Sequence, residues 1–255
     1  MGDFGVKHLT GLAWLFGLII TLLIVTLVIR KKYHKGENYD RNVVKYAAIF
    51  IWIWEFIKTI YIFNSAAYGG VGDYTAYMLP FHICSMALYA YVIIGFSKGK
   101  LSNFIKPFAF ATMLLVTSII LTIPDSSGIL GGEANWSFID ANILPYQSFL
   151  YHGTLVFVPL YMVFSGFYNP KISDIWKATI TLLVTATFAF TLNKVLGVTD
   201  FMMLEYGNGN PFQYLVSSNY LLYLAILAGV AIGGTAVILG LAQLLKKIFG
   251  KKAKA

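Results

Sequence analysis

The sequence predicts an all-α, polytopic integral membrane protein: a bundle of seven transmembrane helices in a single domain, residues 1–255. Composition supports this fold class, because 58% of the 255 residues are hydrophobic and only 12% are charged. A soluble domain carries about twice as much charge, ~25% of its residues. Water is therefore not the main solvent of this chain.

Seven apolar segments are long enough to cross a membrane. A hydrocarbon core of ~30 Å needs ~20 helical residues at a rise of ~1.5 Å each. The predicted spans are 12–29, 45–64, 76–97, 104–123, 145–166, 174–195 and 216–245. The first span is a poor signal peptide, because its apolar run is long and no small-residue cleavage site precedes the charge cluster. We expect it to remain as a helix.

The distribution of Lys and Arg predicts the orientation. Cytoplasmic loops retain basic residues during insertion. Alternate loops and the tail are basic: Arg30, Lys31, Lys32, Lys35, Arg41 and Lys45; Lys98, Lys100 and Lys106; Lys171 and Lys177; Lys246, Lys247, Lys251, Lys252 and Lys254. The loops near 65–75, 124–144 and 196–215 contain no Lys or Arg. This alternation predicts an N-terminus outside and a cytoplasmic C-terminus. It also explains the net charge of +8 without nucleic acid as a partner.

Two further features concern packing. The segments 125–144 and 198–214 mix acidic, glycine and large apolar residues, so we expect them to lie at the interface or to fold back over the bundle. Ala225, Gly229 and Gly233 place small residues at every fourth position of the last span, which lets another helix approach closely. We favour packing within the bundle over a dimer face, and the oligomeric state stays open.

Polar side chains inside the spans are the candidates for function. An ionisable group there costs at least ~2.5 kcal/mol, so each must face a partner, a cavity or water. They are Glu55, Lys58, His82, Cys84, Ser85, Thr117, Ser118, Gln147, Ser148, His152, Thr154, Asn193, Lys194 and Asn219. The predicted orientation places the two histidines, the cysteine and the Glu–Lys pair in the outer half, whereas 91–96 and 156–164 are apolar. We therefore expect a polar chamber that opens outward above a hydrophobic floor.

The spacing of these residues suggests pairs. Glu55 and Lys58 are three residues apart on one helical face, and a structural ion pair is favoured over a catalytic acid and base. An imidazole in a span needs hydrogen-bond partners and titrates near neutral pH, which makes His82 and His152 candidates for a base, a ligand or a proton shuttle. Ser148 lies one turn before His152 and is placed to orient its ring.

Cys84 is the single cysteine, either a small hydrophobe or a nucleophile. On a helix His82 and Cys84 would point ~200° apart, unless Pro80 distorts the turn. The pairings that remain are Cys84 with His152 and His82 with His152. In the first, His152 takes the thiol proton and the thiolate attacks an ester carbonyl. Two more side chains are candidates to stabilise the oxyanion: Asn193 and Lys194.

Three strings carry a family resemblance: Leu79-Pro80-Phe81-His82-Ile83-Cys84-Ser85, Gln147-Ser148-Phe149-Leu150-Tyr151-His152-Gly153 and Leu192-Asn193-Lys194-Val195-Leu196-Gly197. Together they resemble the bacterial YwaF-like integral membrane proteins, a group remotely similar to the eukaryotic transmembrane protein 164 family, which is implicated in acyl transfer between phospholipids. The resemblance implies a plasma-membrane protein that acts on lipid acyl esters without metal or cofactor. It implies Cys84 as nucleophile, His152 as base and His82 as a second polar member.

Two functions follow from these residues. The first is an acyltransferase or lipid hydrolase that uses membrane phospholipid as its substrate. The second is a binding or transport protein that uses the same chamber without covalent chemistry; the apolar inner halves argue against it, because a transport path needs polar groups on both sides. Bis-histidine haem ligation is a weak signal, and the middle of the last span lacks the lysine that retinal requires.

Overall fold

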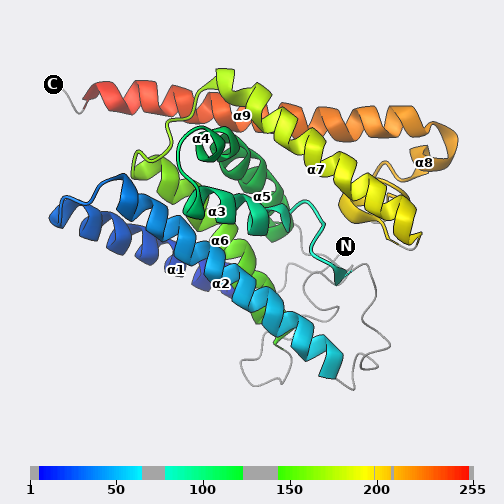
Figure 1. Cartoon of the computed structure of the whole chain (residues 1–255), viewed down its shortest axis with the longest axis horizontal. Helices are drawn as coiled ribbons and strands as arrows, with labels where there is room; N and C mark the ends of the chain where they lie inside the picture. Colours follow the sequence, from blue (N-terminus) through cyan, green and yellow to red (C-terminus); the bar gives the residue numbers. More distant parts are fainter. Residues whose placement is uncertain (1–5, 65–77, 123–142, 198, 208–209, 253–255) are drawn as a thin grey trace.

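The computed structural model describes residues 6–64, 78–122, 143–197, 199–207 and 210–252. Every regular element in these ranges is a helix, so the all-α prediction is confirmed for them (Figure 1). The helices are α1 Val6–Lys32, α2 Glu37–Asn64, α3 Met86–Phe96, α4 Lys100–Pro107, α5 Met113–Thr122, α6 Leu144–Phe164, α7 Ile175–Leu196, α8 Tyr214–Ser218 and α9 Tyr220–Lys252. A π-helix, η4 Phe108–Thr112, joins α4 to α5, and short 3-10 helices occur at η5 Ile172–Asp174 and η6 Phe201–Met203.

Within the described residues, 5 helical stretches are long and apolar enough to cross a membrane: Leu9–Lys32, Glu37–Asn64, Lys100–Leu121, Ile172–Leu196 and Tyr220–Ile248. The chain is thus a multi-pass membrane protein. α3 is apolar but has only 11 residues. α6 is not among the 5, and polar residues in its first half lower its apolar character. The count of seven spans and the outward N-terminus therefore stay predictions.

The predicted third span, 76–97, is helical only from Met86 onward, and residues 78–85 form turns instead. The amide of Phe81 donates to the carbonyl of Leu79 at 2.8 Å, and that of Ser85 donates to the carbonyl of His82 at 2.9 Å. Pro80 explains the break, because it lacks an N–H and disfavours helical backbone in the residue before it. The helical geometry assumed for His82 and Cys84 was therefore wrong.

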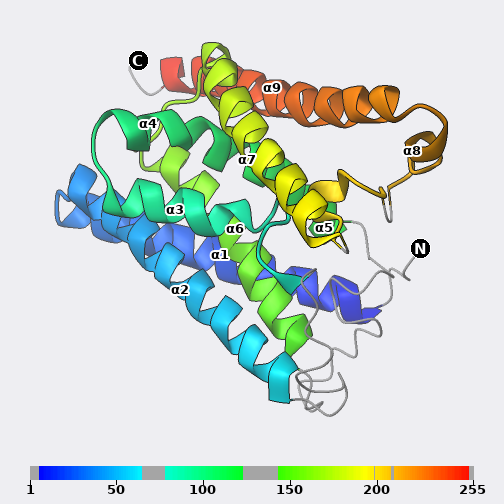
Figure 2. The same cartoon turned by 45° about the vertical axis from the view of Figure 1, so that its right-hand side comes forward.

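α6 is the central helix of the bundle. It packs against α1 and α2 on one side and against η4 and α5 on another, while α7 and α9 cover the face of η4 that lies away from α1 (Figures 1 and 2). The α1–α2 connection and the C-terminal end of α9 lie at the same end, on the left of Figure 1. We call this the basic end, because it carries the Lys- and Arg-rich connections.

Contacts between these connections confirm that they share one end. Lys106 of α4 donates to the carbonyl of Phe167 at 3.0 Å, and Lys246 of α9 donates to Asn169 at 2.6 Å. Arg41 of α2 donates to the carbonyl of Ser97, just after α3. The alternation of basic loops along the sequence is thus an alternation in space.

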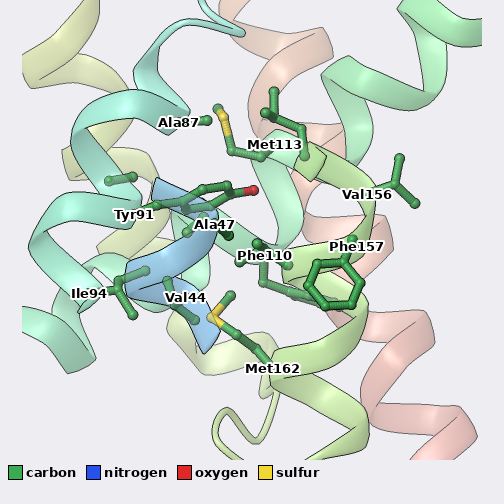
Figure 3. Close-up of a cluster of buried hydrophobic side chains, with 14 of the residues drawn as sticks. Val44, Ala47, Ala87, Tyr91, Ile94, Phe110, Met113, Val156, Phe157 and Met162 are labelled. Atoms are coloured by element: carbon green, nitrogen blue, oxygen red, sulfur yellow. The ribbon is translucent and has the colours of Figure 1, made fainter. Parts of the chain in front are cut away.

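The predicted hydrophobic floor is present as a layer of fully buried side chains near the middle of the bundle (Figure 3). α3 contributes Tyr91 and Ile94, η4 and α5 contribute Phe110 and Met113, and α6 contributes Met162. None of these five side chains is more than 3% exposed. The layer belongs to one buried core, and the carbonyl of its residue Ile94 accepts a hydrogen bond from Arg41 of the basic end at 3.2 Å.

The sequence predicted an apolar inner half, but the structure buries charged residues there. Asp40 is 1% exposed and accepts two hydrogen bonds from Arg30, at 2.7 and 2.9 Å, and one from the hydroxyl of Tyr161 at 2.7 Å. Lys106 is 4% exposed, and its ammonium lies 3.5 Å from the centre of the Phe167 ring. Arg30 and Lys106 were assigned to cytoplasmic loops, but these connections fold against one another and bury Asp40 and Lys106.

The small-residue stripe in α9 does not pack within the bundle. Ala225, Gly229 and Gly233 are exposed, and a Cβ added at either glycine would meet no atom within 4 Å. The packed face is offset by one residue: a Cβ on Gly234 would lie 2.5 Å from Leu115. The preference for packing inside the bundle was therefore wrong, because periodicity alone does not fix which side of a lone helix faces its neighbours.

The burial of Asp40 predicts a large stability effect. Asp40→Asn keeps the shape but removes the charge that pairs with Arg30, and losing one partner of a buried pair costs about 3 kcal/mol or more. The control is Lys35→Gln, which removes an exposed charge from the same end of the bundle and should cost under about 1 kcal/mol. Thermal denaturation in detergent measures both changes. Equal losses would contradict the assignment of Asp40 as the central acceptor of this network.

Candidate functional site

α2 supplies an ion pair at the end of the bundle opposite the basic end. The ammonium of Lys58 lies 2.5 Å from the carboxylate of Glu55, as the three-residue spacing predicted. Glu55 is 7% exposed, and Lys58 is partly exposed. Lys58 lies within electrostatic range of both Cys84 and His152.

α6 supplies a buried histidine in a defined protonation geometry. His152 is 5% exposed, and its Nδ1 lies 2.7 Å from the carbonyl oxygen of Ser148 and 3.3 Å from the Ser148 hydroxyl. A carbonyl oxygen only accepts, so Nδ1 carries the proton and Nε2 of the neutral ring is a bare acceptor. Within the described residues, Nε2 is buried and has no hydrogen-bond partner. The predicted orientation of His152 by Ser148 is confirmed.

The turn before α3 supplies the thiol. Cys84 is half-buried, two residues ahead of the first residue of α3, and its carbonyl accepts the amide of Ala87 at 3.2 Å. A helix N-terminus favours negative charge, as does the nearby ammonium of Lys58, whereas burial opposes it. Burial has the larger effect, and the Glu55 carboxylate adds to it, so Cys84 rests as a neutral thiol.

Tyr151 connects the turn to α6, and its position in the sequence did not mark it as a site residue. Its hydroxyl donates to the carbonyl of Cys84 at 3.4 Å, and its ring meets that of His152 edge-on at 5.4 Å between centres. A buried tyrosine in an apolar span ordinarily indicates core packing. Only the turn at 78–85, which carries Cys84 toward α6, gives Tyr151 its position in the site.

Five residues from three elements therefore form one group, which we call the polar cluster: Glu55, Lys58, Cys84, Tyr151 and His152. Gln147 and Ser148, both buried, precede His152 on the same helix. The thiol of Cys84 does not hydrogen-bond to His152 Nε2 in this structure. The proposed Cys–His pair is thus brought into one group without a direct bond.

His82 lies at the edge of this group. Its ring meets that of Phe201 edge-on, at 5.2 Å between centres. Phe201 is 0% exposed and also meets Phe81 at 5.5 Å. The prediction that segment 198–214 folds back over the bundle is confirmed for Phe201, which presses on the turn that carries Cys84.

Asn193 holds the loop that carries Phe201. Its side-chain oxygen accepts the amide of Phe201 at 2.8 Å and the hydroxyl of Thr199 at 2.9 Å, and its nitrogen donates to the carbonyl of Phe201 at 3.1 Å. Lys194 pairs with Glu205 at 2.5 Å and is 55% exposed. The structure thus engages both side chains in the loop, and a role toward an oxyanion stays a prediction.

No group of three or more His, Cys, Asp or Glu side chains within the described ranges is placed to hold a metal ion. The predicted loop segment 65–75 and residues 125–142 of the second loop lie outside the described residues. The chemistry available to the polar cluster is therefore that of a thiol, an imidazole, a phenol and an ion pair.

The hydrogen bonds of Asn193 predict a second stability effect. Asn193→Leu leaves the buried amide and carbonyl of Phe201 without partners, which costs about 2–4 kcal/mol. Asn193→Asp keeps the acceptor and should cost less. Thr191→Val is the control, because this exposed threonine bonds only to its own helix. The measurement is thermal denaturation in detergent, and a tolerated Asn193→Leu would show that the loop does not depend on this side chain.

Comparison with known proteins agrees with this architecture. The sequence matches the TMEM164 family over residues 4–239, a range that includes the whole polar cluster and most of α9. Searches of curated proteins and of solved structures give no match. The matched range covers most of the chain, so this multi-pass membrane protein belongs to the TMEM164 family.

Proposed function

We propose that the protein is a membrane-embedded acyltransferase or lipid hydrolase that acts on phospholipid acyl esters, with Cys84 as nucleophile and His152 as base. Family membership is compatible with such an activity. The observation that carries the proposal is the bare Nε2 of His152. A buried acceptor without a partner is costly, and it lies in the same group as the thiol.

The reaction has two steps. The Cys84 thiol gives its proton to Nε2 of His152, directly or through one water, and the sulfur attacks the ester carbonyl carbon. The tetrahedral intermediate breaks its bond to the glycerol oxygen, which takes the proton back from His152 and leaves as the lysophospholipid alcohol. A thioester on Cys84 remains. Water or a second alcohol then attacks the thioester, which gives hydrolysis or acyl transfer and restores the thiol.

The neighbouring residues have positioning roles in this proposal. Ser148 fixes the tautomer of His152, because its carbonyl keeps the proton on Nδ1. Tyr151 holds the backbone of Cys84 against α6. The ammonium of Lys58 stabilises negative charge on the thiolate and on the oxyanion, and Glu55 keeps that ammonium in place.

The second candidate is a binding or transport protein that uses the polar cluster without covalent chemistry. The buried charges of the basic end favour it, since Asp40 and Lys106 supply polar groups on the second side. The layer of Figure 3 argues against it, because its side chains are buried and mostly apolar, with the hydroxyl of Tyr91 as a polar exception. An acyl enzyme needs its reacting groups on one side of this layer only, so the layer favours the enzyme over the transporter.

Labelling of Cys84 tests the catalytic pair. An alkyne-tagged fatty-acyl electrophile should modify wild-type protein in membranes and leave Cys84→Ser unlabelled. His152→Ala should slow the labelling by about 100-fold, the lower range of a general base. Thr154→Val is the matched control, because Thr154 also lies on α6 but bonds only to its own helix. Unchanged labelling in a folded His152→Ala protein would count against the pair.

Turnover of lipid separates the two candidate functions. Purified protein in phospholipid vesicles should release lysophospholipid, and Cys84→Ser and His152→Ala should abolish the release while Thr154→Val retains it. Mass spectrometry of the extracted lipids measures the products. Solute uptake that survives Cys84→Ser, with no acyl product, would favour the transport function instead.

A further inference from the structure

An apolar groove runs along the seam between α2 and α3, on the surface of the bundle. Its volume is about 460 Å³. Its lining is entirely apolar or aromatic and comes from Ile49, Trp52, Ile53, Phe56, Val92 and Phe96. The two helices touch closely at one point of the seam, since a Cβ on Gly95 would lie 2.6 Å from the Cα of Lys45.

The occupant of this groove must be hydrocarbon. α2 is one of the stretches long and apolar enough to cross a membrane, so the groove faces the acyl region of the bilayer. Phe56 is 65% exposed and Phe96 is 56% exposed, so the walls project beyond the seam. Such walls present apolar surface on both sides of one extended chain.

One end of the groove points to Cys84. Trp52, a lining residue, donates from its ring nitrogen to the carbonyl of Leu88 at 3.2 Å. The amide of Leu88 in turn bonds to the carbonyl of Ser85 at 3.0 Å, so Cys84 lies one helical turn beyond the Trp52 contact. From Met86, where α3 begins two residues after Cys84, to Phe96 the helix advances 10 residues, about 15 Å at helical rise. This is the length scale of a long acyl chain.

Charge marks the two ends and fixes the direction. Lys58 lies beside Cys84 at one end, and the ammonium of Lys45 lies 4.8 Å from the Phe96 ring at the other. An anionic headgroup can meet an ammonium at either end. The half-buried thiol selects the first, because an ester bond must reach Cys84 to react.

We propose that the α2–α3 groove is the acyl-chain subsite for the substrate: the chain of a long-chain glycerophospholipid ester lies in it, with its carbonyl at Cys84 and its phosphate near Lys58. This inference rests on the proposed thiol chemistry and adds a specificity to it. Ile49 and Phe96 line the end of the groove that lies away from Cys84. Only a long acyl chain reaches and contacts them, so long chains are preferred over short ones.

Filling the far end tests this specificity. Ile49→Trp should lower the rate at which a 16-carbon acyl electrophile labels Cys84 by about tenfold, the effect of losing about two buried methylene groups. Labelling by a 6-carbon probe should not change, because that chain does not reach Ile49. Ile180→Trp is the matched control, since Ile180 of α7 is 43% exposed, close to the 39% of Ile49, and lies outside the groove.

A second measurement does not depend on reactivity. A phospholipid with a diazirine in its acyl chain should crosslink, in the inactive Cys84→Ser protein, to the groove residues of α2 and α3 more than to α7, and Ile49→Trp should reduce this crosslinking. Crosslinks in the groove without any Cys84 labelling in wild type would support lipid occupancy and overturn the thiol chemistry. Cys84 labelling that ignores both chain length and Ile49→Trp would overturn the subsite and leave the proposed function standing.

Discussion

The rest of this structure depends on the absence of water in the bilayer, which obliges polar groups to find partners inside the bundle. Asp40 meets this constraint with Arg30 and Tyr161, Glu55 meets it with Lys58, and Asn193 meets it with the backbone of its own loop. The Nε2 atom of His152 does not meet it within the described residues. Among the described residues, four other buried polar atoms also lack a partner, on Arg41, Tyr91, Thr117 and Glu205. The bare acceptor of His152 is the one that belongs to the polar cluster with the thiol, and it therefore calls for a functional account.

Pro80 determines where the backbone places the thiol. An uninterrupted helix over 76–97 would have set Cys84 in a regular span, whereas the turns at 78–85 set it at the N-terminus of α3, against Tyr151. Irregular backbone at membrane depth is tolerated where protein covers it. Phe201 provides cover by packing on Phe81 and His82, and Asn193 holds Phe201 in place. His82 and Asn193 thus support the turn from which Cys84 acts.

Local spacing predicted the contacts that lie within one helix. The Glu55–Lys58 pair and the bond between Ser148 and His152 both follow from helical periodicity. Contacts between distant segments were beyond such reasoning: nothing local reveals that Tyr151 would meet Cys84, or that the ammonium of Lys106 would lie over the Phe167 ring. Hydrophobic periodicity also failed in α9, because a helix that is apolar on all sides carries no mark of its packed face.

The side from which a ligand reaches the polar cluster distinguishes the two candidate functions, acyl transfer and transport. A chamber that opens only to water would suit a solute. The apolar layer would then close the chamber on its inner side, so that a solute could enter but not cross. A groove that opens to lipid suits an ester whose chain stays in hydrocarbon while its carbonyl meets the thiol. In that arrangement the apolar layer has a use, because it keeps the buried charges of the basic end away from the reacting carbonyl. The same layer that obstructs a transport path therefore favours a lipid substrate.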